Sequence, residues 1–183
     1  MADAHPSPER IMQILSGFQE TQTLKGAIAL GLFTEVAQGH KTVAALAKQL
    51  KADARAVETL CDGLTVMQFL AKSGGEDALT PDAAIFLDPR SPAYMGGVTG
   101  FLLSPELMSA WTDVAAVVRR GGPEGLANIA PEAPVWVEFA KGMGPFAAMT
   151  AKMMAGILAK GGAMRSVLDV AAGHGLFGIE IAK

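Results

Sequence analysis

The stretch that decides the fold is VLDVAAGHGLFGIEIAK, from Val167 to Lys183. Its first four residues are apolar apart from one acid, which predicts a short β-strand. Gly173, Gly175 and Gly178 follow with the spacing G-x-G-x-x-G, and apolar residues then begin a helix. Such glycines let backbone approach a ligand, because they lack the Cβ atoms that would block it. The stretch predicts the first βα unit of a nucleotide-cofactor fold, the alternative being an ordinary tight βα turn.

Length and composition limit the class of protein. The chain has 183 residues, half of them apolar, and a net charge of −3. This length suits one domain, or a small domain plus part of another. The weak negative charge argues against a dedicated nucleic-acid binder. We expect a cytoplasmic protein, because the sequence shows neither a signal peptide nor an apolar run long enough to cross a membrane. The single Cys61 is expected to be a buried structural thiol, and the scattered histidines predict no metal site.

Most of the remaining sequence predicts helices. Residues 9–37 have a helical apolar pattern, with a break expected near residues 17–22 because glycine weakens it there. A second helix is expected over residues 104–120, from a Ser-Pro start to a Gly-Gly stop. The composition of residues 121–134 predicts a loop. The following helical segment is expected to be interrupted near residues 142–145, which contain two glycines and a proline.

Between these helices lies a more specific pattern. Thr42 and Asp53 are suitable N-caps for two short helices joined by a tight turn, which predicts a helix-turn-helix. The pair Gly74–Gly75 predicts the turn of a β-hairpin, and Thr80–Pro81 predicts the start of another short helix. Helices followed by a hairpin in this order predict a winged helix.

Asp169 refines the prediction for the final stretch. The order Asp-x-x-x-Gly-x-Gly resembles the first motif of class I S-adenosylmethionine-dependent methyltransferases. In that family the acid helps organise the loop and the cofactor. The resemblance implies that Asp169, Gly173, His174 and Gly175 bind S-adenosyl-L-methionine, although His174 could equally be a solvent-facing loop residue. The family commonly has glycine where this chain has Ala171, and alanine fits there if its φ is negative.

The order of the upstream segments resembles the two-domain O-methyltransferases, including plant phenolic, hydroxyneurosporene-type and acetylserotonin-type enzymes. The stretches that carry it are GAIALGLFTEVA, LAKQLKADARAVETLCDGL, and LTPDAAIFL followed by SPAYMGG. The resemblance implies a mainly α chain in three parts. Residues 1–100 would form a winged-helix-like dimerisation domain and 101–164 a helical connector. Residues 165–183 would start a Rossmann-like cofactor domain.

The same resemblance implies two further site residues. EFAKGMGPFAAMT is similar to a family segment with Phe and Met four residues apart. Phe139 would therefore border the substrate, and Met143 both cofactor and substrate. A ring and a thioether suit the walls of an apolar pocket. The alternative is simple packing within the core of a helix, since residues at i and i+4 share a face.

The resemblance implies an S-adenosyl-L-methionine-dependent O-methyltransferase that acts on a small, hydroxylated, aromatic or polyene-like molecule. It also implies a homodimer formed through the N-terminal helical domain. The ribose-binding acid and the catalytic histidine are expected beyond residue 183, so no catalytic residue is assigned. We therefore expect an N-terminal portion of a protein about twice this length, inactive by itself.

Two other classes of function remain open. One is a non-enzymatic dimerisation or regulatory module that keeps only a relic of the cofactor motif. The other is a winged-helix DNA-binding regulator. Its recognition helix would offer Arg55, but also Glu58 and Asp62, and this acidic surface would repel phosphate. No nucleic-acid or membrane partner is expected.

Overall fold

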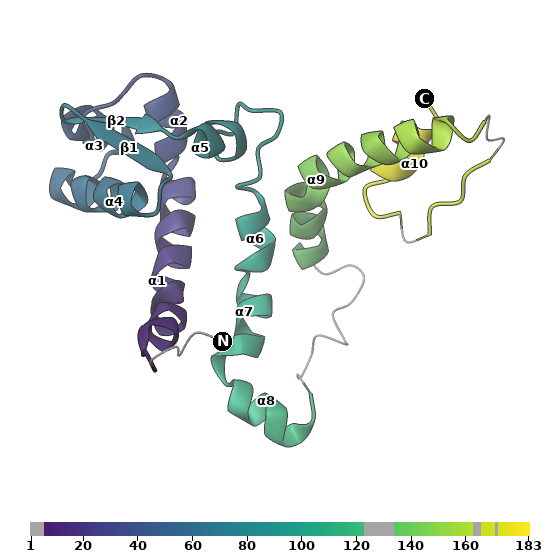
Figure 1. The fold of residues 1–183 in the computed structure, drawn as a ribbon, viewed down its shortest axis with the longest axis horizontal. Helices are drawn as coiled ribbons and strands as arrows, with labels where there is room; N and C mark the ends of the chain where they lie inside the picture. The colour runs from purple at the N-terminus through teal and green to yellow at the C-terminus, as the bar shows by residue number, and fades with distance from the viewer. Residues whose placement is uncertain (1–5, 123–133, 163–165, 171) are drawn as a thin grey trace. The chain divides into compact units, whose positions relative to one another are not determined.

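The computed structural model describes residues 6–122, 134–162, 166–170 and 172–183 (Figure 1). The chain divides into two compact units, Met1–Arg90 and Ser91–Lys183, called here the N-terminal and the C-terminal unit. Among the described residues, no helix is both long enough and apolar enough to cross a bilayer.

The N-terminal unit begins with a long helix, α1, from Glu9 to Leu30. It runs without interruption through residues 17–22, so the break predicted there is wrong. A glycine inside a helix costs only about 1 kcal/mol relative to alanine, which the rest of a 22-residue helix can offset. The chain instead turns at Gly31, which has a φ of 76° and donates its N–H to the last turn of α1. Helix α2, Leu32–Ala37, follows directly.

The predicted helix-turn-helix is confirmed as a pair of capped helices, α3 (Val43–Leu50) and α4 (Ala54–Val66). The side chains of Thr42 and Asp53 each accept a hydrogen bond from the backbone N–H three residues on, at 3.3 and 3.0 Å. Each cap therefore satisfies one of the N–H groups that the first turn of a helix leaves without a partner.

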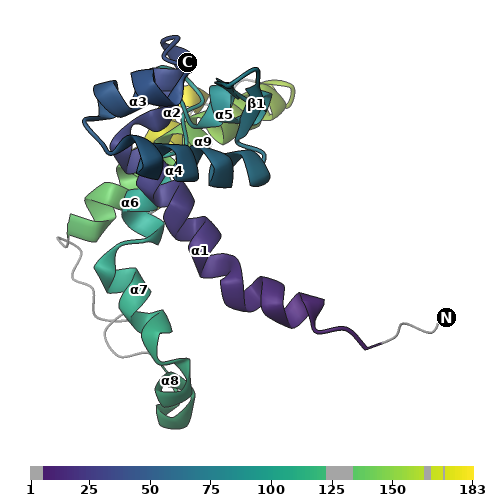
Figure 2. The same cartoon turned by 90° about the vertical axis from the view of Figure 1, so that its left-hand side faces the viewer.

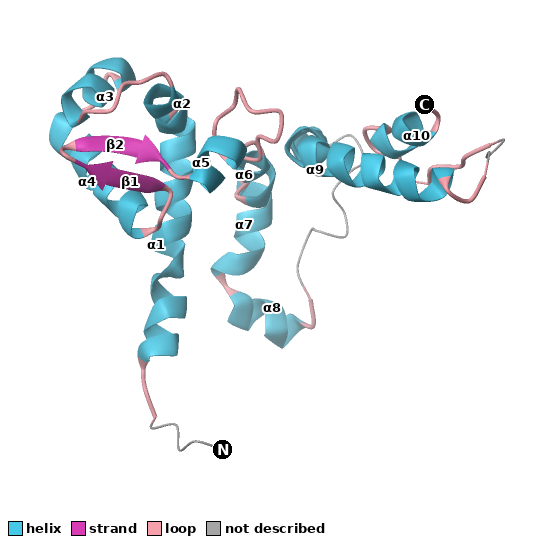
Figure 3. Cartoon of the chain, turned by 45° about the horizontal axis from the view of Figure 1, so that its top comes forward, coloured by secondary structure: helices cyan, strands magenta, loops and turns pink. Residues whose placement is uncertain are grey.

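The predicted hairpin is also confirmed. Strands β1 (Leu70–Ser73) and β2 (Glu76–Leu79) pair antiparallel across Gly74 and Gly75, whose φ angles are 58° and 81° (Figure 3). A two-residue turn with both φ angles positive matches the right-handed twist of paired strands, and glycine adopts it without strain. The chain then enters α5, Pro81–Phe86, at the predicted Thr-Pro start.

The core of the N-terminal unit gathers where the hairpin and α2, α3 and α4 meet. Its buried members are Ala27, Leu32, Phe33, Val36, Leu46, Ala47, Val57, Cys61, Leu64, Leu70 and Ala83. The predicted burial of Cys61 is confirmed, and burial raises the pKa of its thiol to about 12. A buried thiol with a raised pKa is the form expected of a structural cysteine.

The C-terminal unit starts with three short helices: α6 (Val98–Leu102), α7 (Pro105–Thr112) and α8 (Val114–Arg120). The single helix predicted over residues 104–120 is wrong, because the chain leaves helical geometry at Asp113. That side chain accepts the N–H of Ala116 at 2.8 Å, so it caps a new helix instead of continuing the old one. The predicted stop is confirmed, since Gly121 takes a left-handed φ of 85°.

Helix α9 runs from Pro134 to Ala159 and continues through residues 142–145, so the predicted interruption is wrong. Pro145 lies inside the helix, where it removes one backbone donor. Helix α9 packs against both α6 and α10, and such tertiary contacts can override local propensity. Most of the predicted loop over 121–134 lies outside the described residues.

The predicted strand at Val167–Val170 does not form, although the helix after the glycines does, as α10 (Leu176–Ile181). A strand needs a neighbour that accepts its hydrogen bonds, and the described part of the C-terminal unit contains none. The segment is irregular and its apolar side chains are exposed, Leu168 by 87% and Val170 by 80%. The predicted βα unit is therefore present only as loop and helix.

Candidate ligand pocket of the C-terminal unit

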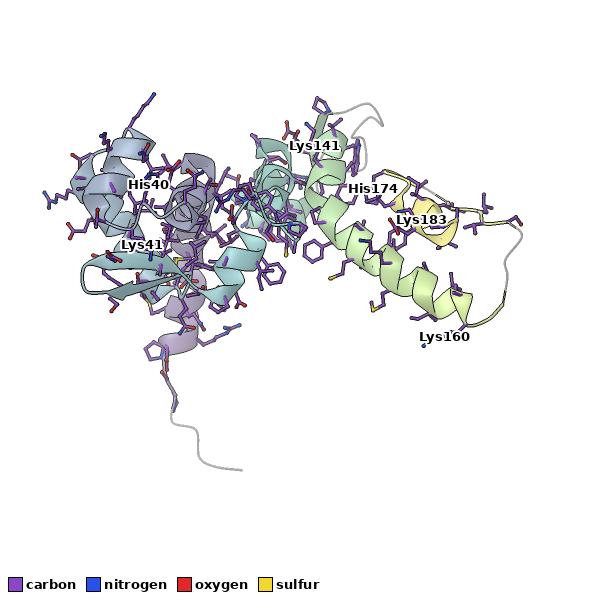
Figure 4. The ribbon with its side chains drawn as sticks, turned by 90° about the horizontal axis from the view of Figure 1, so that it is seen from above. His40, Lys41, Lys141, Lys160, His174 and Lys183 are labelled. Carbon is purple, nitrogen blue, oxygen red and sulfur yellow. The ribbon has the colours of Figure 1, made fainter. Side chains whose placement is uncertain are left out.

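A pocket of about 780 Å³ lies between the first turns of α9 and the loop that leads into α10. We call it the aromatic pocket, and its lining residues are Trp136, Phe139, Ala140, Asp169, Val170, Ala172, Gly173, His174 and Phe177. Helix α10 packs directly on α9, which holds the two sides of the pocket together. Figure 4 shows His174 on the loop that lies beside α9.

Asp169 organises the loop of this pocket. Its carboxylate Oδ2 accepts the backbone N–H of Gly178 at 3.3 Å, which ties the segment before the glycines to the first turn of α10. A Cβ built on Gly178 would lie 3.7 Å from the same oxygen, which is an ordinary contact. Asp169 therefore makes a specific hydrogen bond here, whereas the space around Gly178 does not by itself require a glycine.

Gly173 and Gly175 are needed for the shape of the turn. Their φ angles are 54° and 69°, in the left-handed region that other residues adopt only with strain. The N–H of Gly175 donates to the carbonyl of Ala172 at 2.7 Å, which closes the turn. Gly173 lines the aromatic pocket, whereas Gly175 lies outside its lining.

His174 is half-buried and lies in the lining of the pocket. Its ring Nδ1 accepts the N–H of Leu176 at 3.3 Å, so the imidazole caps the start of α10. A ring that accepts at Nδ1 carries its proton at Nε2 when neutral, which leaves one donor for another group.

The opposite wall of the pocket is aromatic. Phe139 lies edge-to-face against Trp136, with ring centroids 6.2 Å apart and planes at 86°. It also lies against Phe101 of α6, at 4.9 Å and 65°. Met143 is half-buried one turn further along α9 and is not part of the lining.

The structure thus brings together four of the six predicted site residues: Phe139, Asp169, Gly173 and His174. The sequence pattern did not predict Trp136 or Phe177 as site residues. Trp136 precedes Phe139 by three residues, so helical spacing could have placed both on one face. Phe177 gave no such signal, because only the packing of α10 on α9 brings it to the pocket. Among the described residues, no three potential ligands gather in a way that could hold a metal ion.

The N-terminal unit carries an exposed apolar surface on the first half of α1. We call this the α1 stripe, and its members are Ile11, Met12, Ile14, Leu15 and Phe18, each exposed by 60% or more. Figure 2 shows this half of α1 running out beyond the other helices of its unit. A smaller pocket, of about 360 Å³, adjoins the next turns of α1 and is lined by Glu20, Thr21, Leu24, Val66, Met67 and Phe69.

Comparisons with known proteins show what the chain is similar to. Residues 12–88 match the family model of the O-methyltransferase dimerisation domain. The chain therefore carries an O-methyltransferase dimerisation domain and corresponds to the N-terminal portion of proteins of that class, as the sequence predicted.

Particular relatives support this assignment. One is the 3-hydroxy-5-methyl-1-naphthoate 3-O-methyltransferase of Streptomyces sahachiroi, 28% identical over 181 residues, or 96% of this chain and 52% of that protein. Another is the solved structure of a Nostoc punctiforme protein provisionally assigned as an O-methyltransferase. It is 36% identical, has a TM-score of 0.87, and the match covers 98% of this chain and 54% of the other.

A more distant structure shows the same fold. CalO1, a methyltransferase in calicheamicin biosynthesis solved with SAH bound, is 23% identical with a TM-score of 0.74, over 94% of this chain and 54% of its own. The chain thus spans about half the length of the relatives it matches.

Proposed function

We propose that the whole protein is an S-adenosyl-L-methionine-dependent O-methyltransferase of a small hydroxylated aromatic molecule. The C-terminal unit would contribute part of the donor site. The observation that carries the proposal is the aromatic pocket, in which a glycine turn, an organising acid and aromatic side chains converge. The naphthoate-methylating relative supports this chemistry.

The residues present fit such a cofactor. The pocket volume of about 780 Å³ is within the usual range for small-molecule sites. Gly173 leaves backbone open to a ligand, and the rings of Trp136 and Phe139 suit both an adenine ring and a sulfonium cation. When bound, S-adenosylmethionine supplies an activated methyl group. The residues of this chain would hold and orient it and exclude water, and none of the described residues is assigned as the catalytic base.

We also propose that the N-terminal unit is winged-helix-like and forms a homodimer through the α1 stripe, in a cytoplasmic protein. Five large apolar side chains exposed along half of one helix form the kind of surface that marks an interaction site. The match to a dimerisation domain over residues 12–88 supports a second copy of the chain as the partner.

Calorimetric titration of S-adenosylhomocysteine into the 183-residue chain tests the donor site. We expect weak binding to the unmodified chain, and an affinity lower by about tenfold or more for Asp169→Ala, because the loop loses its tie to α10. Asp82→Ala is the control, since Asp82 is exposed on α5 in the other unit. Equal affinity in all three proteins, or no binding at all, would contradict the assignment of the pocket.

Light-scattering mass measurements test the dimer. We expect a dimer for the unmodified chain and for Ile85→Glu, whose side chain is 46% exposed on α5. Phe18→Glu should give a monomer, because a carboxylate would have to be buried in the apolar interface. A dimer that survives the Phe18 substitution would exclude the α1 stripe as the interface.

DNA binding has less support than methyl transfer. In the hairpin, the ammonium of Lys72 is paired with Asp62 of α4, so this cation is engaged within the protein. Salt-dependent binding of the chain to duplex DNA would favour the DNA-binding alternative over methyl transfer.

Methyl transfer by the purified chain would contradict the expectation that these residues are inactive alone.

A further inference from the structure

Helices α6 and α9 approach so closely that their backbones are in contact. A Cβ built on Gly142 of α9 would lie 2.8 Å from the Cα of Val98 and 3.0 Å from the carbonyl oxygen of Gly97. Distances this short leave no room for any side chain at Gly142. The glycine therefore sets how near α6 can come to α9.

The close approach of α6 to α9 places the ring of Phe101 against the ring of Phe139. Phe101 lies one turn after Val98 on α6, and Phe139 lies one turn before Gly142 on α9. Their ring centroids are 4.9 Å apart in an edge-to-face arrangement, a geometry that orients both rings. Phe139 in turn contacts Trp136, and both of these line the aromatic pocket, whereas Phe101 does not.

Helix α6 has only five residues, too few to be stable without packing. Its position relative to the pocket thus depends on the glycine contact and on the aromatic pair. Any change that pushes α6 away from α9 would remove the contact that supports Phe139, without replacing any of the residues that line the pocket.

We propose that Gly142 and Phe101 are positioning residues for the aromatic pocket. They hold Phe139 against Trp136, so that the two rings form a fixed wall for the ligand. This inference rests on the proposed donor site and names two residues outside the pocket lining that determine its affinity.

A matched pair of glycine substitutions tests the role of Gly142. A Cβ built on Gly144, on the same helix, meets no atom within 4 Å. Both Gly142→Ala and Gly144→Ala raise helix propensity, so a difference between them reports the packing alone. We expect S-adenosylhomocysteine to bind the Gly142 variant about tenfold more weakly than the unmodified chain, and the Gly144 variant normally, because a displaced wall loses preorganisation. Equal affinity of the two variants would overturn the proposal.

A second series tests the ring of Phe101. Phe101→Leu should weaken binding by about fivefold, and Phe101→Tyr, which keeps the ring, should restore it. The control is Leu102→Ala, because Leu102 is the next residue on α6 and is 54% exposed. If the leucine variant binds as tightly as the tyrosine variant, the ring of Phe101 has no positioning role.

A spectroscopic measurement separates this inference from the proposed function. In a Trp111→Phe background, the tryptophan signal comes from Trp136 alone. We expect Gly142→Ala and Phe101→Leu to change the near-ultraviolet circular dichroism and acrylamide quenching of Trp136 without any ligand. An unmodified chain that binds no S-adenosylhomocysteine would contradict the donor site, and the Trp136 signal would then decide the positioning role. An unchanged Trp136 signal in both variants would overturn the positioning role of Gly142 and Phe101.

Discussion

The two units of this chain use apolar residues in opposite ways. The N-terminal unit buries a core of them between its hairpin and its helices, and leaves those of the α1 stripe exposed. In the described part of the C-terminal unit, the buried apolar residues are Val135, Ala147 and Ala151, all of them small or medium in size. Many of its other apolar side chains are exposed, and they include Trp111, Val118, Met149, Met153, Ile157, Leu168 and Val170.

The difference follows from architecture, because an apolar stripe is buried only where another element covers it. In the N-terminal unit, α2 contacts α3, α5 and β2, and α4 contacts α1, α3 and β1, so the inner faces of α2 and α4 are covered, whereas the α1 stripe is not. In the C-terminal unit, α6 and α10 contact α9, but Met149, Met153 and Ile157 of that helix remain exposed. We expect the N-terminal unit to unfold cooperatively and the C-terminal unit to open locally at lower cost.

The largest expected effect comes from the same substitution made in both units. Leu64 is fully buried on α4 and Leu168 is 87% exposed. Leu64→Ala should lower the free energy of unfolding by about 2–5 kcal/mol, because it leaves a cavity in a packed core. Leu168→Ala should change it by less than about 0.5 kcal/mol. Urea unfolding followed by circular dichroism measures both, and similar losses would mean that the two units do not differ in this way.

A smaller effect is expected from two glycines of the N-terminal unit. Gly31→Ala forces a side chain to adopt a φ of 76°, and should destabilise the unit by about 1–2 kcal/mol. Gly17→Ala lies inside α1 with open space around its Cβ, and should stabilise the helix by up to about 1 kcal/mol. The midpoint of thermal unfolding should therefore fall for Gly31→Ala and rise for Gly17→Ala. A shift of the same sign in both variants would contradict the assignment of Gly31 as the point where the helix ends.

Removal of an N-cap should distinguish the two units further. Asp53→Ala and Asp113→Ala each remove a side-chain acceptor worth about 1 kcal/mol to the helix that it caps. In the cooperative N-terminal unit, the loss at Asp53 should lower the stability of every core amide. At Asp113 it should speed hydrogen exchange only within α8. Exchange measured residue by residue would contradict the comparison if the Asp113 variant also loosened α9.

The smallest effect concerns a buried acid of β2. Asp77 is fully buried beside the thiol of Cys61, and among the described residues its carboxylate accepts no hydrogen bond from a backbone N–H. Burial raises the pKa of this carboxyl, although the ammonium of Lys72 opposes the shift. The folded state therefore binds the proton more tightly than the unfolded state does. The contribution of Asp77 is most favourable at acid pH and is lost as pH rises through the folded pKa.

Asp77→Asn should remove this pH dependence and raise stability at pH 7 by on the order of 1 kcal/mol or less. Urea midpoints at several pH values above 4 measure it. A variant with the same pH profile as the unmodified chain would show that another group causes the dependence.

Prediction from sequence succeeded where structure depends on a few adjacent residues. Thr42, Asp53 and the Gly74–Gly75 turn were each identified because a cap or a tight turn is complete within four residues. It failed at Gly142 and Pro145, which are helix-breaking residues in isolation. Packing against α6 and α10 keeps α9 continuous through both of them, and no local pattern carries that information.

The candidate site also combines features that follow from local sequence with features that depend on packing. The sequence by itself determined the loop: the acid at Asp169 and the positive φ angles of Gly173 and Gly175 depend on local geometry. Only the tertiary structure decided that Phe177 completes the pocket and that Met143 lies outside its lining. It also decided that Val167–Val170 is irregular, because a strand forms only when a second strand accepts its hydrogen bonds.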